Sequence, residues 1–172
     1  MLISLLKMTE IFANPEVDVV KTKREVKFLK SEFSAKVKKS MKKIKVLFVC
    51  IENSNRSQMS QAFANMVGGG EVEAYSAGSK PSGIVNPKAI AAMKELGYDL
   101  SKHDSKSLDE VKVFAPFDAV VTMGCGDACP WMPAKQFFDW QIPDPKNMEP
   151  AQFNEVRDFI EEKVKNLLQA LK

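Results

Sequence analysis

The chain has 172 residues, of which 45% are hydrophobic and 27% are charged, and this composition is typical of a globular protein with one core. No apolar run is long enough to cross a membrane, and the first residues lack the pattern of a signal peptide, so we expect a cytoplasmic protein. The net charge of +3 is uneven: residues 1–43 carry eleven Lys and Arg against five Asp and Glu, whereas the rest carries fourteen against seventeen.

Residues 1–43 are predicted to form a basic helical extension, separate from a catalytic domain at 44–172. Apolar residues recur at helical spacing from Val26 to Val37 and predict one amphipathic helix over about residues 16–40. The simplest interpretation is an accessory helix, and contact with nucleic acid or an anionic membrane is the alternative. No aromatic-basic motif accompanies the charges, so we expect neither partner.

Residues 44–172 alternate between strand and helix signals. In chain order they predict a buried strand at 44–49, a helix at 57–67, a strand at 71–76, a helix at 87–97, a short helix near 107–113, a buried strand at 117–123, an edge strand at 135–140 and a long helix at 150–171. This alternation predicts an α/β fold with a parallel sheet and helices on both of its faces. The last helix places five apolar residues on one face: Phe153, Val156, Ile160, Val164 and Leu168.

The segment CIENSNRS at residues 50–57 has a cysteine at the end of the first buried strand and an arginine just before a helix. Ligands of open parallel sheets bind at the carboxyl ends of strands. The backbone N–H groups of such a loop can form an anion nest, and the N-terminus of the following helix reinforces it. Arg56 can close the nest as a planar donor, and the same positive field stabilises a thiolate on Cys50.

The segment therefore predicts Cys50 as a nucleophile beside a tetrahedral oxyanion, with Ser57 donating a hydrogen bond to the sulfur. In a reducing compartment, three cysteines favour such chemistry over a disulfide framework. The alternative is that Cys50 is a small apolar residue that ends a strand. Seven residues are predicted to bind the anion: Ile51, Glu52, Asn53, Ser54, Asn55, Arg56 and Ser57.

Residues 44–172 resemble the low-molecular-weight tyrosine phosphatases, whose signature is C-x5-R-[ST], and more closely the arsenate reductase branch of that superfamily. The resemblance rests on five segments: CIENSNRSQM at 50–59, YSAGS at 75–79, LSKHDSKS at 100–107, VVTMGCGDACP at 120–130 and DWQIPDP at 139–145. It implies a three-layer α/β fold whose four-stranded, mainly parallel sheet has the order 2-1-3-4, with the N-terminal helix as an addition. Gln58 and Met59 favour the reductase branch.

The resemblance also implies roles for the two distal cysteines. Cys125 corresponds to the first resolving cysteine of the family's redox pair, and Cys129 to the second. Their spacing is shorter than in thioredoxin-coupled members and matches a GCGDxCP variant, some members of which use a small-molecule thiol. Packing in a loop, or half of a zinc site, is the alternative for the pair. His103 is the only histidine, so we expect no metal site.

The family places its general acid in an Asp-Pro pair late in the chain, which corresponds here to Asp144-Pro145. The proline restricts the loop and presents the carboxylate, and Asp139 is the rival candidate. Asn53 matches an asparagine that keeps the family's loop in shape. Some reductases bind potassium near it, but Lys106 stands where an acidic ligand of the ion is expected. A fixed ammonium can replace the ion, so we expect no potassium dependence.

The predicted function is reduction of arsenate to arsenite through a Cys50–Cys125–Cys129 disulfide relay. It implies a monomer with no bound cofactor and an external reductant: a thioredoxin, glutaredoxin or mycoredoxin system, or a low-molecular-weight thiol. Two alternatives remain open. One is a phosphatase acting on phosphotyrosine or a small phosphomonoester through a phospho-Cys50 intermediate. The other is a non-enzymatic thiol or oxyanion sensor.

Overall fold

The computed structural model of the protein describes residues 43–124 and 131–172. The predicted N-terminal helix, Cys125 and Cys129 lie outside the described residues, and the division into an extension and a catalytic domain stays a prediction. Within the described ranges, no helix is both long and apolar enough to cross a membrane.

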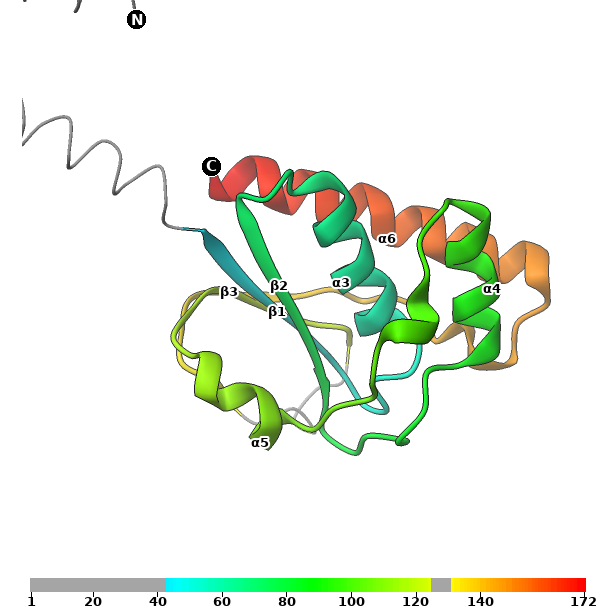
Figure 1. The fold of residues 1–172 in the computed structure, drawn as a ribbon, viewed down its shortest axis with the longest axis horizontal. Coiled ribbons are helices and arrows are strands. Elements are labelled where there is room, and N and C mark those ends of the chain that lie inside the picture. Colours follow the sequence, from blue (N-terminus) through cyan, green and yellow to red (C-terminus); the bar gives the residue numbers. More distant parts are fainter. Residues whose placement is uncertain (1–42, 125–130) are drawn as a thin grey trace, which may run out of the picture. The chain divides into compact units, whose positions relative to one another are not determined.

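Four parallel strands form one sheet in the order β2-β1-β3-β4, which confirms the predicted fold class and strand order (Figure 1). The strands are β1 (Ile44–Cys50), β2 (Val72–Gly78), β3 (Phe117–Thr122) and β4 (Ala134–Asp139). β1 lies inside the sheet, and its run of apolar residues is buried from Val46 to Cys50. β4 is an edge strand whose residues are all exposed or half-buried, which confirms the edge strand predicted at 135–140.

Helices cover both faces of the sheet, as the alternating pattern predicts. α3 (Arg56–Val67), α4 (Pro87–Glu95) and α6 (Pro150–Leu171) lie on one face, and the short α5 (Leu108–Val111) lies on the other (Figure 1). Three 3-10 helices complete the described elements: η1 (Leu100–Lys102), η2 (Lys112–Phe114) and η4 (Pro145–Asn147).

The helix predicted near 107–113 is in fact divided between α5 and η2. Ser107 and Glu110 start α5 with a reciprocal capping box. The segment cannot continue as a helix because Ala115 precedes Pro116 and is therefore held in an extended conformation.

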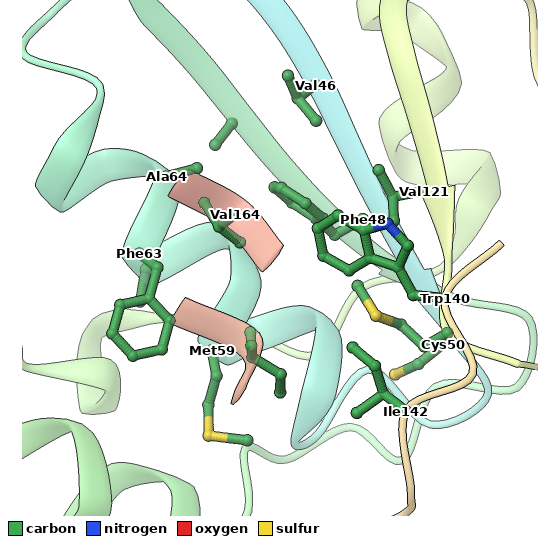
Figure 2. Close-up of a cluster of buried hydrophobic side chains, with 14 of the residues drawn as sticks. Val46, Phe48, Cys50, Met59, Phe63, Ala64, Val121, Trp140, Ile142 and Val164 are labelled. Carbon is green, nitrogen blue, oxygen red and sulfur yellow. The ribbon is translucent and has the colours of Figure 1, made fainter. Parts of the chain in front are cut away.

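Alternation along β1 divides the apolar residues between two cores, because successive strand residues point to opposite faces. Leu47 and Val49 pack toward α5, in the smaller cluster. The larger cluster lies between the sheet and the long helices, and Cys50 belongs to it together with Trp140 and Ile142 (Figure 2). All five residues predicted on the apolar face of α6 are buried in this cluster: Phe153, Val156, Ile160, Val164 and Leu168.

Candidate active site

Cys50 is the last residue of β1 and belongs to the larger apolar cluster, yet its sulfur has two polar partners. The residue is 3% exposed. Ser57 Oγ lies 3.0 Å from the sulfur, and the Asn53 backbone N–H donates to it at 3.2 Å. Asn53 Nδ2 donates to Ser57 Oγ at 2.8 Å, which leaves the Ser57 hydroxyl hydrogen free to point at the sulfur. Two donors aimed at one sulfur stabilise a thiolate, and this disfavours a purely structural role for Cys50.

The carbonyl groups of the anion loop (residues 50–57) point away from the sulfur. Backbone N–H groups within residues 80–86 donate at 2.8 to 3.0 Å to the carbonyls of three loop residues: Ile51, Glu52 and Ser54. In a trans peptide unit the N–H points opposite to the C=O, so the loop N–H groups face the other side, toward the sulfur. Asn53 sustains this curl with a φ of 48°, in the left-handed region that asparagine tolerates. The loop therefore has the form of the predicted nest.

The N-terminus of α3 adds to the positive field of the anion loop. Its N-cap residue, Asn55, makes no side-chain capping hydrogen bond, and the first turn holds no acidic residue. The first N–H groups of a helix need partners from outside the helix, and the helix dipole favours an anion there. An oxyanion beside Cys50 would meet both the loop and the helix.

Gly78 lets the anion loop pass close to β2, a role that was not predicted from the sequence. A Cβ atom at this position would lie 2.5 Å from the Ile51 carbonyl oxygen and 2.9 Å from the Asn53 backbone nitrogen. Gly78 pairs with Cys50 in the β1–β2 register, so the close approach occurs directly beside the nucleophile. The AGS tripeptide at the end of β2 is the sequence signal that could have indicated it.

Replacing Gly78 with alanine should displace the anion loop, since both clashing atoms belong to backbone. We expect a loss of about 1–3 kcal/mol in the free energy of unfolding, together with weaker phosphate binding in isothermal titration. Gly70→Ala is the control: Gly70 has a φ of 82° and open space around it, so its replacement strains only the backbone. The idea is wrong if both variants bind phosphate as the wild type does.

Arg56 is held at the carboxyl ends of the strands. Its Nη1 donates to the carbonyls of Met123 at 2.9 Å and Ile142 at 3.0 Å, residues that follow β3 and β4. Its Nη2 donates to Asp144 Oδ2 at 3.2 Å. A guanidinium carries five donors in a rigid plane, so Arg56 can keep the two carbonyls and still face an anion in the loop.

Asp144 and Asp139, the two candidates for the general acid, have different surroundings. Asp144 lies beside Arg56, and its side chain is 51% exposed. Asp139 accepts hydrogen bonds from Thr122 Oγ1 at 2.6 Å, Gln141 Nε2 at 2.6 Å and the Gly124 backbone. The Thr122 hydroxyl is the main cause that lowers the pKa of Asp139, which keeps this carboxylate ionised. These surroundings favour Asp144 as the acid.

The structure thus brings most of the predicted site residues together. Five of them meet around the sulfur or the guanidinium: Cys50, Asn53, Arg56, Ser57 and Asp144. Ser54 and Asn55 are buried in the loop, whereas Ile51 is partly exposed. The Glu52 side chain turns to Lys146, not to the sulfur. No three His, Cys, Asp or Glu side chains gather as a metal site would require in the part of the chain that the structure describes.

A partly buried hydrogen-bond network beside the anion loop was not predicted. Gln58 Nε2 donates to Asn53 Oδ1 at 2.9 Å, to the Asn53 carbonyl and to the Asp104 carbonyl. Gln58 Oε1 must therefore accept, and its partner is His103 Nδ1 at 3.0 Å. The proton of a neutral imidazole then resides on Nδ1, and Nε2 accepts from the Tyr98 hydroxyl at 2.9 Å. The network holds the amide oxygen of Asn53, whose Nδ2 bonds the Ser57 hydroxyl beside the sulfur.

His103 is expected to make the stability of the fold depend on pH. Burial, with a smaller contribution from the nearby Lys106 charge, lowers the pKa of His103. A base whose pKa is lower in the folded state contributes fully above its unfolded pKa of about 6.5 and loses that contribution as pH falls through the folded value. Between about pH 7 and pH 5, urea unfolding should therefore show a larger loss of stability for the wild type than for His103→Gln. Equal losses would contradict the expectation.

Lys106 lies beside the same asparagine. Its backbone N–H donates to Asn53 Oδ1 at 2.7 Å, and its ammonium donates to the Asp104 carbonyl at 2.8 Å. Burial lowers the pKa of Lys106. The absence of a potassium requirement stays a prediction: turnover should be equal in potassium and sodium salts at the same ionic strength, and severalfold stimulation by potassium would contradict it.

Known proteins resemble the described residues in sequence and in fold. The family model described as low molecular weight phosphotyrosine protein phosphatase matches residues 45–172. A glutaredoxin arsenate reductase of Synechocystis sp. is 39% identical over 127 residues, which cover 72% of this chain and 95% of that relative. A solved arsenate reductase in the phosphate-binding state has a TM-score of 0.69 at 37% identity and covers 75% of this chain and 99% of that chain. The thioredoxin-dependent arsenate reductase of Corynebacterium glutamicum has a TM-score of 0.65 at 31% identity, over 80% of this chain and 66% of that chain.

Proposed function

Because the chain belongs to the low molecular weight phosphotyrosine protein phosphatase family, we propose that it uses the Cys50 thiolate to reduce arsenate to arsenite. The observation that carries the proposal is the Cys50 sulfur, which has Ser57 Oγ and the Asn53 backbone N–H as polar partners, with Arg56 in the same loop paired to Asp144. This arrangement suits a tetrahedral oxyanion. Relatives named as arsenate reductases, one of them 39% identical, favour arsenate over a phosphomonoester.

In the first step, arsenate occupies the anion loop and the Cys50 thiolate attacks arsenic. A sulfur–arsenic bond forms and one arsenic–oxygen bond breaks. Asp144, in its protonated form, gives its proton to the departing hydroxide, which leaves as water. Arg56 and the loop N–H groups stabilise the negative charge on the remaining oxygens.

The reduction occurs in the second step, in which the Cys125 thiolate attacks the Cys50 sulfur. A Cys50–Cys125 disulfide forms, and the electron pair of the sulfur–arsenic bond stays on arsenic. Arsenic(V) becomes arsenic(III) and leaves as arsenite, while two cysteines are oxidised. Cys129 then attacks Cys125, which frees Cys50 and leaves a Cys125–Cys129 disulfide for an external reductant.

The reductant we propose is an external thiol system, with no cofactor bound to the enzyme. One relative is named for glutaredoxin, and a structural neighbour is thioredoxin-dependent. Either class of protein can reduce a disulfide by thiol exchange. A reducing compartment favours this cycle, so we propose a cytoplasmic monomer that acts on a free oxyanion, without nucleic acid or membrane partners.

The proposal is tested by arsenate-dependent NADPH consumption with thioredoxin and thioredoxin reductase. Wild type is compared with Cys125→Ser and Cys129→Ser, and Cys50→Ser serves as the blank. We expect turnover by the wild type and its loss in both variants, because each sulfur takes part in one exchange of the relay.

Two other results would change the proposal. Turnover with glutathione and glutaredoxin that survives Cys129→Ser would keep arsenate reduction and remove the intramolecular relay. No arsenate turnover with either donor, together with hydrolysis of p-nitrophenyl phosphate that needs Cys50, would make the protein a phosphatase. In that case water would release a phospho-Cys50 intermediate, and the distal cysteines would have no part in the reaction.

A further inference from the structure

Two ion pairs join the anion loop to the acid loop (residues 142–147) among the described residues. One is Arg56–Asp144, with Nη2 and Oδ2 at 3.2 Å. The other is Glu52–Lys146, with Oε1 and Nζ at 2.6 Å across 94 residues of sequence. Lys146 is two residues beyond Asp144, and its backbone N–H donates to Asp144 Oδ1 at 3.2 Å. The position of Lys146 is thus coupled directly to the position of the acid.

The two pairs differ in what the reaction does to them. Arg56 must engage the oxyanion, and Asp144 must be protonated to act as an acid, so substrate binding weakens the pair between them. The side chains of Glu52 and Lys146 pair with each other and take no part in either event. The lysine hydrogen bond is the main cause that lowers the pKa of Glu52, and Glu52 in turn raises the pKa of Lys146, so both stay charged through the reaction.

The backbone of Glu52 is itself held in place by two hydrogen bonds to its carbonyl group. Its carbonyl accepts from the Ser82 backbone N–H at 3.0 Å and from Ser105 Oγ at 3.0 Å. We propose that Glu52 and Lys146 are positioning residues that keep the acid loop over the anion loop while Arg56 and Asp144 are engaged with substrate. This proposal rests on the function proposed above, and it concerns the placement of the acid and not the chemistry of the sulfur.

The test uses the full-length reduced protein and measures the loss of free thiols after mixing with excess arsenate, without external reductant. Lys146→Gln and Glu52→Gln should each lower the maximal rate about two- to fivefold, the range expected for a partly exposed ion pair. The exchanged pair, Glu52→Lys with Lys146→Glu, should return to within about twofold of wild type. In the Asp144→Asn background, Lys146→Gln should have no further effect, because no acid remains to be positioned.

Lys165→Gln is the matched control. It removes one lysine from a pair with Glu161 at 2.7 Å on α6, and the lysine is 50% exposed, as Lys146 is. We expect its maximal rate to be unchanged. A role through local charge alone predicts a different pattern: Lys146→Gln and Glu52→Gln would shift the half-saturating arsenate concentration in opposite directions and leave the maximal rate alone. That pattern, or an exchanged pair as slow as the single variants, would overturn the proposal.

The same experiment separates failure of this inference from failure of the proposed function. If the wild type loses no thiols with arsenate, arsenate reduction itself is wrong, whatever the variants do. The comparison of the same proteins then moves to hydrolysis of phenyl phosphate, whose leaving group also needs an acid. The expected and the contradicting patterns of maximal rates stay the same.

Discussion

Replacing Arg56 with lysine is expected to lower kcat/KM for arsenate about 10²- to 10³-fold, the cost typical of losing a preorganised oxyanion donor. Lysine keeps the charge but carries it as a point on a flexible stem. A lysine ammonium cannot donate to the Met123 and Ile142 carbonyls and at the same time donate to the anion through a second nitrogen. The measurement is the thioredoxin-coupled assay over a range of arsenate concentrations.

Arg157→Lys is the matched control for this prediction. Arg157 is also a buried arginine, 7% exposed. It donates hydrogen bonds to the Ala92 carbonyl and to the Glu95 carboxylate, and neither acceptor belongs to the anion loop. Its replacement should lower the melting temperature and leave kcat/KM close to wild type. If Arg56→Lys keeps more than a tenth of the wild-type kcat/KM, Arg56 acts only as a charge and the bidentate role is wrong.

The fold could be predicted from sequence because each element carries a local signal. The run IKVLFV is short and rich in β-branched residues, which favours a buried strand, and the period of apolar residues from Phe153 to Leu168 is helical. The burial of both segments confirms the two predictions. The prediction differed from the structure near 107–113, where one short helix was expected and an α-helix followed by a 3-10 helix is observed. Periodicity cannot distinguish these two cases over so few residues.

Some residues of the candidate site could be predicted from sequence, and others could not. Cys50, Asn53, Arg56 and Ser57 lie within eight residues, so one motif indicates them all. Gly78, His103 and Lys146 reach the anion loop only through the fold, from β2, from the segment after η1 and from η4. No local sequence pattern predicts such contacts between distant segments. The resemblance already favoured Asp144 over Asp139, and the hydrogen-bond partners of the two carboxylates add a physical reason for that preference.

Replacing Asp144 with asparagine is expected to slow arsenate-driven thiol loss about 10²- to 10⁴-fold, the usual contribution of a general acid. The amide has the same shape but no acidic proton for the departing hydroxide. In the wild type, the Asp144 carboxylate lies 3.2 Å from Arg56 Nη2 and competes with the anion for this donor. The variant lacks this carboxylate, so the half-saturating arsenate concentration should not rise. The measurement is rapid mixing of reduced enzyme with arsenate, followed by quenching and titration of free thiols.

Asp139→Asn separates a catalytic carboxylate from a structural one. Asp139 uses its oxygens to accept from Thr122, Gly124 and Gln141, and an amide, with one oxygen, cannot accept all of these bonds. We therefore expect a loss of about 1–3 kcal/mol in the free energy of unfolding, with a rate of thiol loss within about tenfold of wild type. The opposite result, a stable but slow Asp139→Asn beside an active Asp144→Asn, would exchange the two roles. Asp139, at the end of β4, would then be the general acid. The Arg56–Asp144 ion pair would only fix the position of Arg56 before substrate binds.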